Sequence, residues 1–102
     1  MTQKFKSYYA VIFTSTQKEN IEGYSEMAKK MEDLAKNQPG FLGIDSAKNE
    51  IGITVSYWES LEAIKNWKHQ TNHIEAQLKG RKNWYSWYHV RICKVEREYD
   101  FH

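Results

Sequence analysis

The sequence is poor in cysteine and proline, with one of each among its 102 residues. The lone Cys93 excludes a disulfide within the chain, and such low cysteine use is typical of proteins in the reducing cytoplasm. No apolar run approaches the roughly 20 residues that span a membrane, and the N-terminus lacks the apolar stretch and cleavage site of a signal peptide. We therefore expect a cytoplasmic protein without a membrane partner.

A large excess of one charge is also missing, because 15 Lys and Arg residues stand against 13 Asp and Glu residues. Proteins dedicated to nucleic acids usually carry a strong basic excess that binds phosphates, so we expect no nucleic-acid partner. Aromatic residues, in contrast, are abundant at 15%. A domain of this size buries only about two-thirds of the surface that its unfolded chain exposes. Some rings should therefore line a pocket or a subunit interface.

The spacing of apolar residues predicts a strand, a helix, two strands, a second helix and a last strand. The expected strands cover residues 8–15, 41–47, 51–58 and 87–99, and the first helix covers residues 24–36. Ser60 is the expected N-cap of the second helix, whose buried stripe would be Leu61, Ile64 and Trp67. Asn72 begins a capping-box pattern, which predicts that this helix breaks and restarts there.

The third expected strand has two unlike faces. One face is large and apolar, and the other is smaller and more polar, so that one of them is expected to be buried. The first face consists of Ile51, Ile53, Val55 and Tyr57, and the second of Gly52, Thr54, Ser56 and Trp58.

Strands interspersed with two helices favour an α+β fold, namely a ferredoxin-like antiparallel sheet with both helices on one face. We expect a single domain over residues 1–102, with its core at about residues 8–99. The other face of the sheet would be bare, although the first and third strands carry apolar residues there. Packing two copies sheet on sheet would cover this face, so we predict a homodimer that closes a dimeric α+β barrel.

Several motifs resemble the antibiotic biosynthesis monooxygenase family, and the likeness extends over about residues 8–99. They are Gln38-Pro39-Gly40-Phe41-Leu42-Gly43, the strand end Tyr57-Trp58, and Trp67 after an apolar helix. The resemblance implies a dimeric α+β barrel. Its members include cofactor-independent oxygenases of polycyclic phenols or quinones and heme-degrading enzymes, because one fold hosts several activities.

Two departures from the heme-degrading relatives disfavour heme as a cofactor. Those relatives place a heme-ligating histidine ten residues after the helix tryptophan and an asparagine on the first strand. Here Gln77 stands at that distance from Trp67, and the first strand reads Ile12, Phe13 and Thr14. We therefore expect no cofactor, with heme as the disfavoured alternative.

The resemblance to the quinone-forming relatives points to His73 and Trp67 as catalytic residues. His73 stands six residues after Trp67, where those enzymes place a tyrosine. At the start of a helical segment the helix dipole would keep the imidazole neutral, so that it could accept a proton from a phenol. Trp67 would form a flat wall for a planar substrate. The plainer interpretations are local hydrogen bonding for His73 and core packing for Trp67.

The other expected substrate-binding residues are aromatic or basic: Phe13, Trp84, Tyr88, Arg81 and Arg91. The rings would line the pocket, and either arginine could stabilise a phenolate or enolate anion. Basic residues mixed with rings can also bind single-stranded nucleic acid. Here the charges precede the rings instead of alternating with them, which favours a solvated helix end beside pocket aromatics.

His69 and His73 lie four residues apart, a spacing that puts two metal ligands on one face of a helix. Gln70 stands where zinc proteases of this pattern have glutamate, and no Asp or Cys is near, so we expect no metal site. Cys93 lies between Ile92 and Lys94 in an expected strand, and we expect a buried, unreactive thiol.

Together these patterns favour a monooxygenase that inserts oxygen into a small aromatic or polycyclic phenol or quinone. Its partners would be a second copy of the chain and a small-molecule substrate. One alternative is a non-catalytic dimeric module that binds a hydrophobic metabolite or heme. Another is a stress-related dimer whose pocket is vestigial. Turnover of oxygen separates the first interpretation from the other two.

Overall fold

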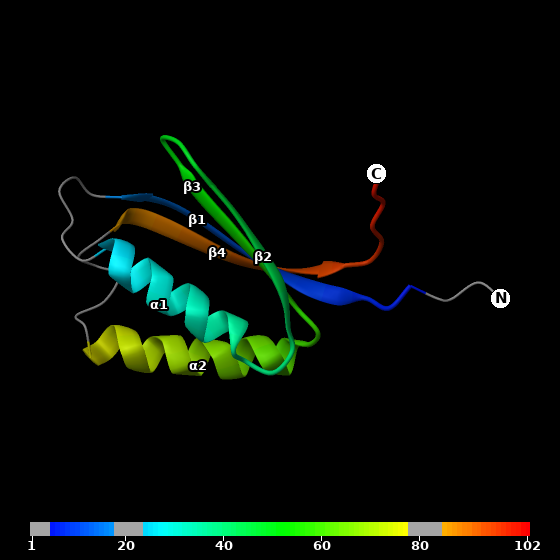
Figure 1. Ribbon diagram of the computed structural model, residues 1–102, viewed down its shortest axis with the longest axis horizontal. Helices are drawn as coiled ribbons and strands as arrows, with labels where there is room; N and C mark the ends of the chain where they lie inside the picture. Colours follow the sequence, from blue (N-terminus) through cyan, green and yellow to red (C-terminus); the bar gives the residue numbers. More distant parts are fainter. Residues whose placement is uncertain (1–4, 18–23, 78–84) are drawn as a thin grey trace.

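The computed structural model describes residues 5–17, 24–77 and 85–102. The elements follow the predicted order (Figure 1). They are β1 (Tyr8–Gln17), α1 (Tyr24–Lys36), β2 (Phe41–Lys48), β3 (Gly52–Trp58), α2 (Leu61–Gln77) and β4 (Tyr85–Val95). Of the helices in these ranges, none is long and apolar enough to cross a membrane.

The four strands form one antiparallel sheet in the order β2-β3-β1-β4. Both helices lie on the same side of this sheet (Figure 1). The two chain ends, N and C, extend from the same end of the molecule, at the right of Figure 1. Each helix joins two strands that have a third strand between them, which is the ferredoxin-like arrangement. The predicted α+β class is therefore confirmed.

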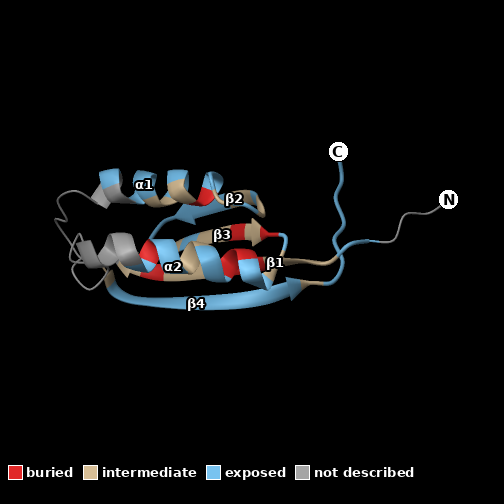
Figure 2. Cartoon of the chain, turned by 90° about the horizontal axis from the view of Figure 1, so that it is seen from below, coloured by how far each residue is buried: buried red, intermediate tan, exposed pale blue. Residues whose placement is uncertain are grey.

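The core lies between the helices and one end of the sheet. Its buried members are Val11, Ala35, Trp58, Ala63 and Ile64. Trp58 is fully buried, and its indole nitrogen donates a hydrogen bond to Ser56 Oγ at 2.9 Å. β4, in contrast, is exposed along nearly its whole length (Figure 2). Side-chain packing is thus concentrated on β1 and β3, the central strands.

Two local features fix the entry of the chain into β2 and α2. Gly40 has a φ of 86°, and a Cβ built there would lie 2.6 Å from the Cβ of Ala63. Only glycine allows both this backbone geometry and this close approach. Ser60 Oγ accepts a hydrogen bond from the Ala63 amide at 3.0 Å, so Ser60 is the N-cap, as predicted.

The predicted break in the second helix is wrong, because α2 continues from Leu61 to Gln77 through Asn72. The neighbouring Thr71 is 1% exposed, and its hydroxyl donates to the Lys68 carbonyl at 2.8 Å. Burial of this turn holds the backbone helical, whereas an N-cap residue would have to leave helical geometry. Leu61 also departs from the prediction, since it is 54% exposed and lies outside the buried stripe.

The last strand ends at Val95, four residues before the predicted end at 99. Val95 pairs with Tyr8, which is the first residue of β1. Residues beyond Val95 therefore have no neighbouring strand to pair with, although their sequence alternates. Cys93 is exposed in β4, so the expected burial of its thiol is wrong for the single chain.

Candidate functional site

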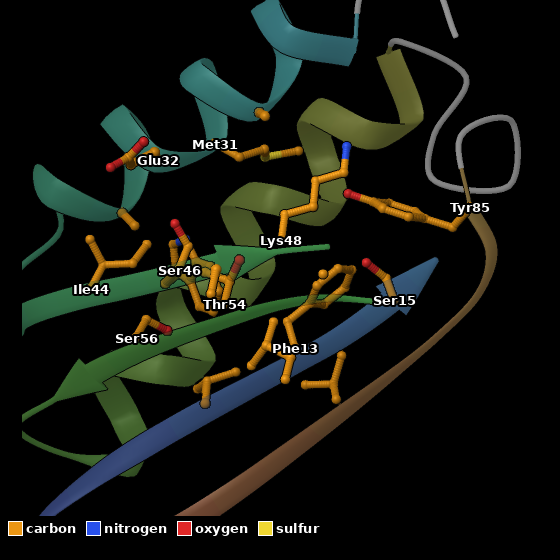
Figure 3. Close-up of a pocket in the computed structure, with 18 of the residues that line it drawn as sticks. Phe13, Ser15, Met31, Glu32, Ile44, Ser46, Lys48, Thr54, Ser56 and Tyr85 are labelled. Atoms are coloured by element: carbon orange, nitrogen blue, oxygen red, sulfur yellow. The ribbon is translucent and has the colours of Figure 1, made fainter. Parts of the chain in front are cut away.

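A cavity of about 380 Å³ lies between the helices and the sheet. Side chains from β1, β2 and β3 form its floor, and side chains from α1, α2 and β4 form its walls (Figure 3). Pockets for small molecules usually measure roughly 300–1,000 Å³, so this one suits a ligand of two or three fused rings. The residues that line it include Phe13, Met31, Lys48, Thr54, Trp67 and Tyr85.

The floor consists of three rows of residues that pair across β2, β3 and β1. The rows are Ile44, Ser56 and Val11, then Ser46, Thr54 and Phe13, then Lys48, Gly52 and Ser15. Most of these side chains are small, and β3 contributes only glycine, threonine and serine. The cavity exists because such residues do not fill the space between a sheet and the helices that cover it.

Aromatic and apolar side chains form the walls. The Phe13 ring stacks on Tyr88 with centroids 5.4 Å apart, and it meets the edge of Tyr85 at the same distance. A register shift beside Gln17 brings Tyr85 and Tyr88 to the same side of β4, although they are three residues apart. Met31 adds a flexible apolar side chain from α1.

Trp67 is a wall residue that has a buried polar group. Its ring stacks on Trp58 with centroids 4.9 Å apart and an interplanar angle of 29°. Its indole nitrogen is buried and has no hydrogen-bond partner among the described residues. An unsatisfied buried N–H costs about 1–3 kcal/mol.

The structure brings together some of the predicted site residues. Trp67 and Phe13 both line the cavity, and Tyr88 stacks on Phe13. Arg91 does not reach this pocket, because it pairs with Ile12 on the opposite face of the sheet. There its Nη2 lies 3.3 Å from His89 Nδ1.

Three predicted residues lie, in whole or in part, outside the described part of the structure. His73 belongs to α2, six residues or about 1.7 turns beyond Trp67, but its side chain is outside the described part of the structure. Arg81 and Trp84 lie in residues 78–84, which are also outside it. Within the described residues, no group of three His, Cys, Asp or Glu side chains could hold a metal ion.

Sequence reasoning missed Lys48, Tyr85, Thr54 and Met31 as lining residues. The small, polar face of the third strand is a signal for Thr54, because small side chains leave space beneath the helices. The same pairing rows place Lys48 on that face. Tyr85 carried no such signal, because its orientation depends on the irregular register beside Gln17.

The opposite face of the sheet carries a polar cluster of two tyrosines and two carboxylates. Tyr8 donates a hydrogen bond to Glu98 at 2.6 Å, and this bond raises the pKa of Tyr8 to about 12. Tyr57 donates to Asp45 at 2.8 Å, which likewise raises the pKa of Tyr57. The two rings meet edge to face at 6.1 Å. These two phenols are therefore held neutral near neutral pH.

Comparison with known proteins agrees with this architecture. The uncharacterized protein YqjZ of Bacillus subtilis (strain 168) is 53% identical over 93 residues, which cover 89% of this chain and 82% of that protein. SnoaB, a cofactor-independent oxygenase from Streptomyces nogalater, matches in structure with a TM-score of 0.65. That match covers 94% of this chain and 97% of SnoaB, at 8% identity.

A candidate antibiotic biosynthesis monooxygenase from Nitrosomonas europaea matches with a TM-score of 0.67, over 91% of this chain and 93% of that one, at 12% identity. At identities this low, the two structural matches show a shared fold, which is the fold that the resemblance implied. The family described as Monooxygenase af470-like matches residues 5–94, and the chain belongs to this family.

Proposed function

We propose that the protein is a cofactor-independent monooxygenase that acts on a small aromatic or polycyclic phenol or quinone-type substrate. The observation that carries the proposal is the cavity of about 380 Å³ lined by Phe13, Tyr85 and Trp67, together with the indole N–H of Trp67, which has no hydrogen-bond partner in the described part of the chain. Flat rings would stack against these walls. A substrate oxygen would accept the hydrogen bond that Trp67 has free to donate.

The chemistry needs a substrate that itself supplies electrons to dioxygen. After loss of a proton, the substrate anion passes one electron to O₂, and the resulting radical and superoxide combine into a peroxide at carbon. Loss of water then leaves a carbonyl, so that a CH₂ group and O₂ become C=O and H₂O. The protein would remove the proton, hold the rings in one orientation and exclude water.

The roles of individual residues follow from this scheme. Trp67 would orient the substrate, and His73 on the same helix would accept the proton. Phe13 and Tyr88, with Trp84, would line the pocket. Arg81 stays our prediction for an anion partner. Arg91 could act only at a different surface, because it lies on the other face of the sheet.

Oxygen uptake tests the proposal directly. Purified protein would be incubated with a panel of anthrones and hydroxylated naphthalenes, with uptake recorded by an oxygen electrode. We expect uptake with at least one substrate, and a loss of about tenfold in kcat/KM for Trp67→Phe, which removes one hydrogen bond to a charged or developing oxygen. Trp87→Phe is the matched control, because Trp87 pairs with Thr16 outside the cavity. His73→Ala should lower the rate further.

The rival function is a non-catalytic module that binds a hydrophobic metabolite or heme in the same cavity. No histidine is among the described lining residues, so none of these residues supplies the expected base, and a hydrophobic metabolite fits this lining better than heme, whose usual ligand is histidine. Absence of oxygen uptake with every substrate, together with tight heme binding seen by absorbance, would support this rival. A measured rate that Trp67→Phe and His73→Ala leave unchanged would overturn the site assignment.

We also propose that the protein works as a homodimer in the cytoplasm. The sheet face away from the helices carries large exposed side chains, such as Ile53 at 43% and Trp87 at 42%. Exposed apolar surface of this kind usually marks an interface. Packing this face against that of a second copy would bury both and form the barrel.

A further inference from the structure

The open face of the sheet, which is the face away from the helices, carries opposite charges at its two edges. One row of paired residues on this face runs from β2 to β4 through Asp45, Val55, Ile12 and Arg91. Residues that pair directly across neighbouring strands point to the same side of a sheet. β2 and β4 are the edge strands, and both are largely exposed (Figure 2). A carboxylate therefore lies at one edge, a guanidinium at the other, and two aliphatic side chains between them.

Neither charged group meets an opposite charge among the described residues. Asp45 accepts a hydrogen bond of 2.8 Å from the hydroxyl of Tyr57, which is a neutral donor. Arg91 Nη2 lies 3.3 Å from Nδ1 of His89, another basic residue. With strands about 4.8 Å apart, the two edges of a four-stranded sheet are roughly 14 Å apart. This distance is too long for an ion pair between Arg91 and Asp45 of one chain.

A two-fold axis parallel to the strands makes this row complementary to itself. Such an axis keeps each row level with the same row of the second copy and reverses the order of the strands, so that β4 of one copy lies over β2 of the other. Arg91 would then face Asp45 of the partner subunit, and Asp45 would face the partner's Arg91. Val55 and Ile12 of both copies would pack between these two ion pairs, as two aligned sheets allow.

Other arrangements of the two sheets leave both charges without a partner. An axis across the strands would place β4 over the same strand of the second copy, and β2 likewise. The open face of β4 has no carboxylate, and the open face of β2 has no cation. Sheets crossed at right angles would place Arg91 over the central strands, whose open-face residues carry no charge. Association that dehydrates a charge without pairing it is unfavourable, so these arrangements are disfavoured.

We propose that two copies associate through this face with β4 of each copy over β2 of the other, oriented by two reciprocal ion pairs between Arg91 of one copy and Asp45 of the other. The inference rests on the proposed homodimer and adds its orientation. The apolar side chains in the middle provide the association, and the charges at the edges select the arrangement, as in interfaces with an apolar centre and a polar rim. Arg91 is thereby assigned to the subunit interface.

Charge exchange tests this orientation. In its own dimer, Arg91→Glu sets carboxylates against carboxylates, and Asp45→Arg sets guanidinium groups against guanidinium groups. Each variant replaces two attractive contacts by two repulsive ones, so we expect its dissociation constant from sedimentation equilibrium to rise about tenfold. An equimolar mixture should form heterodimers in which both contacts are attractive again, with an affinity within about threefold of the wild type. Native mass spectrometry identifies the heterodimers by their mass, and their formation shows that both variants are folded.

The double variant Arg91→Glu/Asp45→Arg should also recover the wild-type affinity. The two positions are too far apart to interact within one copy, so recovery requires contacts between copies. Lys65→Glu and Glu62→Arg are the matched controls, because both residues are exposed on α2, on the other side of the sheet, and undergo the same charge changes. We expect these controls, alone and mixed, to keep the dissociation constant of the wild type.

The orientation, the homodimer and the oxygenase proposal can fail separately. If the single variants weaken the dimer and neither the mixture nor the double variant restores it, the orientation is overturned and the dimer stands. Unchanged dissociation constants in both single variants would overturn the orientation in the same way. A wild-type protein that stays monomeric would overturn the dimer together with its orientation. Oxygen uptake by such a monomer would leave the oxygenase proposal standing.

Discussion

The face of β3 under the helices carries Gly52, Thr54 and Ser56, whereas its open face carries Ile53, Val55 and Tyr57. In most small sheets the larger apolar side chains face the helices, because burial of apolar area drives the packing. Here the covered face has small residues up to the buried Trp58 at its end, and these small residues leave a cavity. The open face has the apolar residues, which need a second surface. The difference teaches that one strand can serve a pocket on one side and an interface on the other.

The largest expected effect is on the free energy of unfolding, and it distinguishes a tryptophan on the covered face from one on the open face. Trp58→Ala removes a fully buried ring and should lower the free energy of unfolding by about 3–5 kcal/mol. Trp87→Ala on the open face should cost less, and its effect should depend on protein concentration if a dimer buries the ring. Denaturant unfolding at two protein concentrations measures both. Equal losses would show that the two faces are equally important to the folded chain.

The next effect concerns association. Ile53→Lys places a charge on the open face and should weaken the proposed dimer by about 3 kcal/mol, or roughly a hundredfold in dissociation constant. Leu61→Lys is the control, because Leu61 is exposed on α2 and lies on the helix side. Sedimentation equilibrium measures the dissociation constants. A wild-type protein that is monomeric at high concentration would refute the dimer.

A smaller effect on the unfolding free energy is expected from substitution of glycine near the start of β2. Gly40→Ala combines a positive φ with an approach of 2.6 Å to Ala63 on α2, so we expect a loss of roughly 1–3 kcal/mol in unfolding free energy. Gly43→Ala is the matched control, because its new Cβ would lie 3.6 Å from the Tyr57 ring, an ordinary contact. Thermal or denaturant unfolding of both variants gives the difference. A neutral Gly40→Ala would contradict the tight packing of this turn.

The smallest effect is a pH dependence on the open face. The hydrogen bond to Glu98 raises the pKa of Tyr8 to about 12, above its unfolded value of about 10. The stabilisation from this bond is therefore complete below pH 10 and is lost as the pH rises towards 12. Absorbance titration of the phenols should show one fewer strongly raised pKa in Glu98→Gln. Asp45→Asn should instead lower the pKa of Tyr57, and a Tyr8 pKa that is unaffected by Glu98→Gln would refute the assignment.

Much of the fold could be predicted from local patterns. The bounds of α1 agree residue for residue with the prediction, since its apolar stripe is regular and Pro39 and Gly40 follow its end. The predicted bounds are wrong where contacts with other segments determine where an element ends. Burial of Thr71 keeps α2 intact through Asn72, and the start of β1 at Tyr8 sets the end of β4. Neither fact can be read from the segment concerned.

The site was predictable to a smaller extent. Trp67 and Phe13 were identified because a resemblance and a strand pattern drew attention to them. Lys48 was not, because a lysine at the end of a strand has no local mark that it faces a cavity. Arg91 was placed at the pocket because the sequence does not reveal which side of β4 faces the helices, and the register shows that it faces the other way.

The alternation of side chains in a strand is a property of the chain alone, and so is the periodicity of a helix. From these alone the order of elements, the fold class and the unlike faces of β3 could be inferred. Which face the helices cover was settled by packing in three dimensions, since alternation distinguishes two faces without saying where each one points. That choice created the cavity and left the apolar face open.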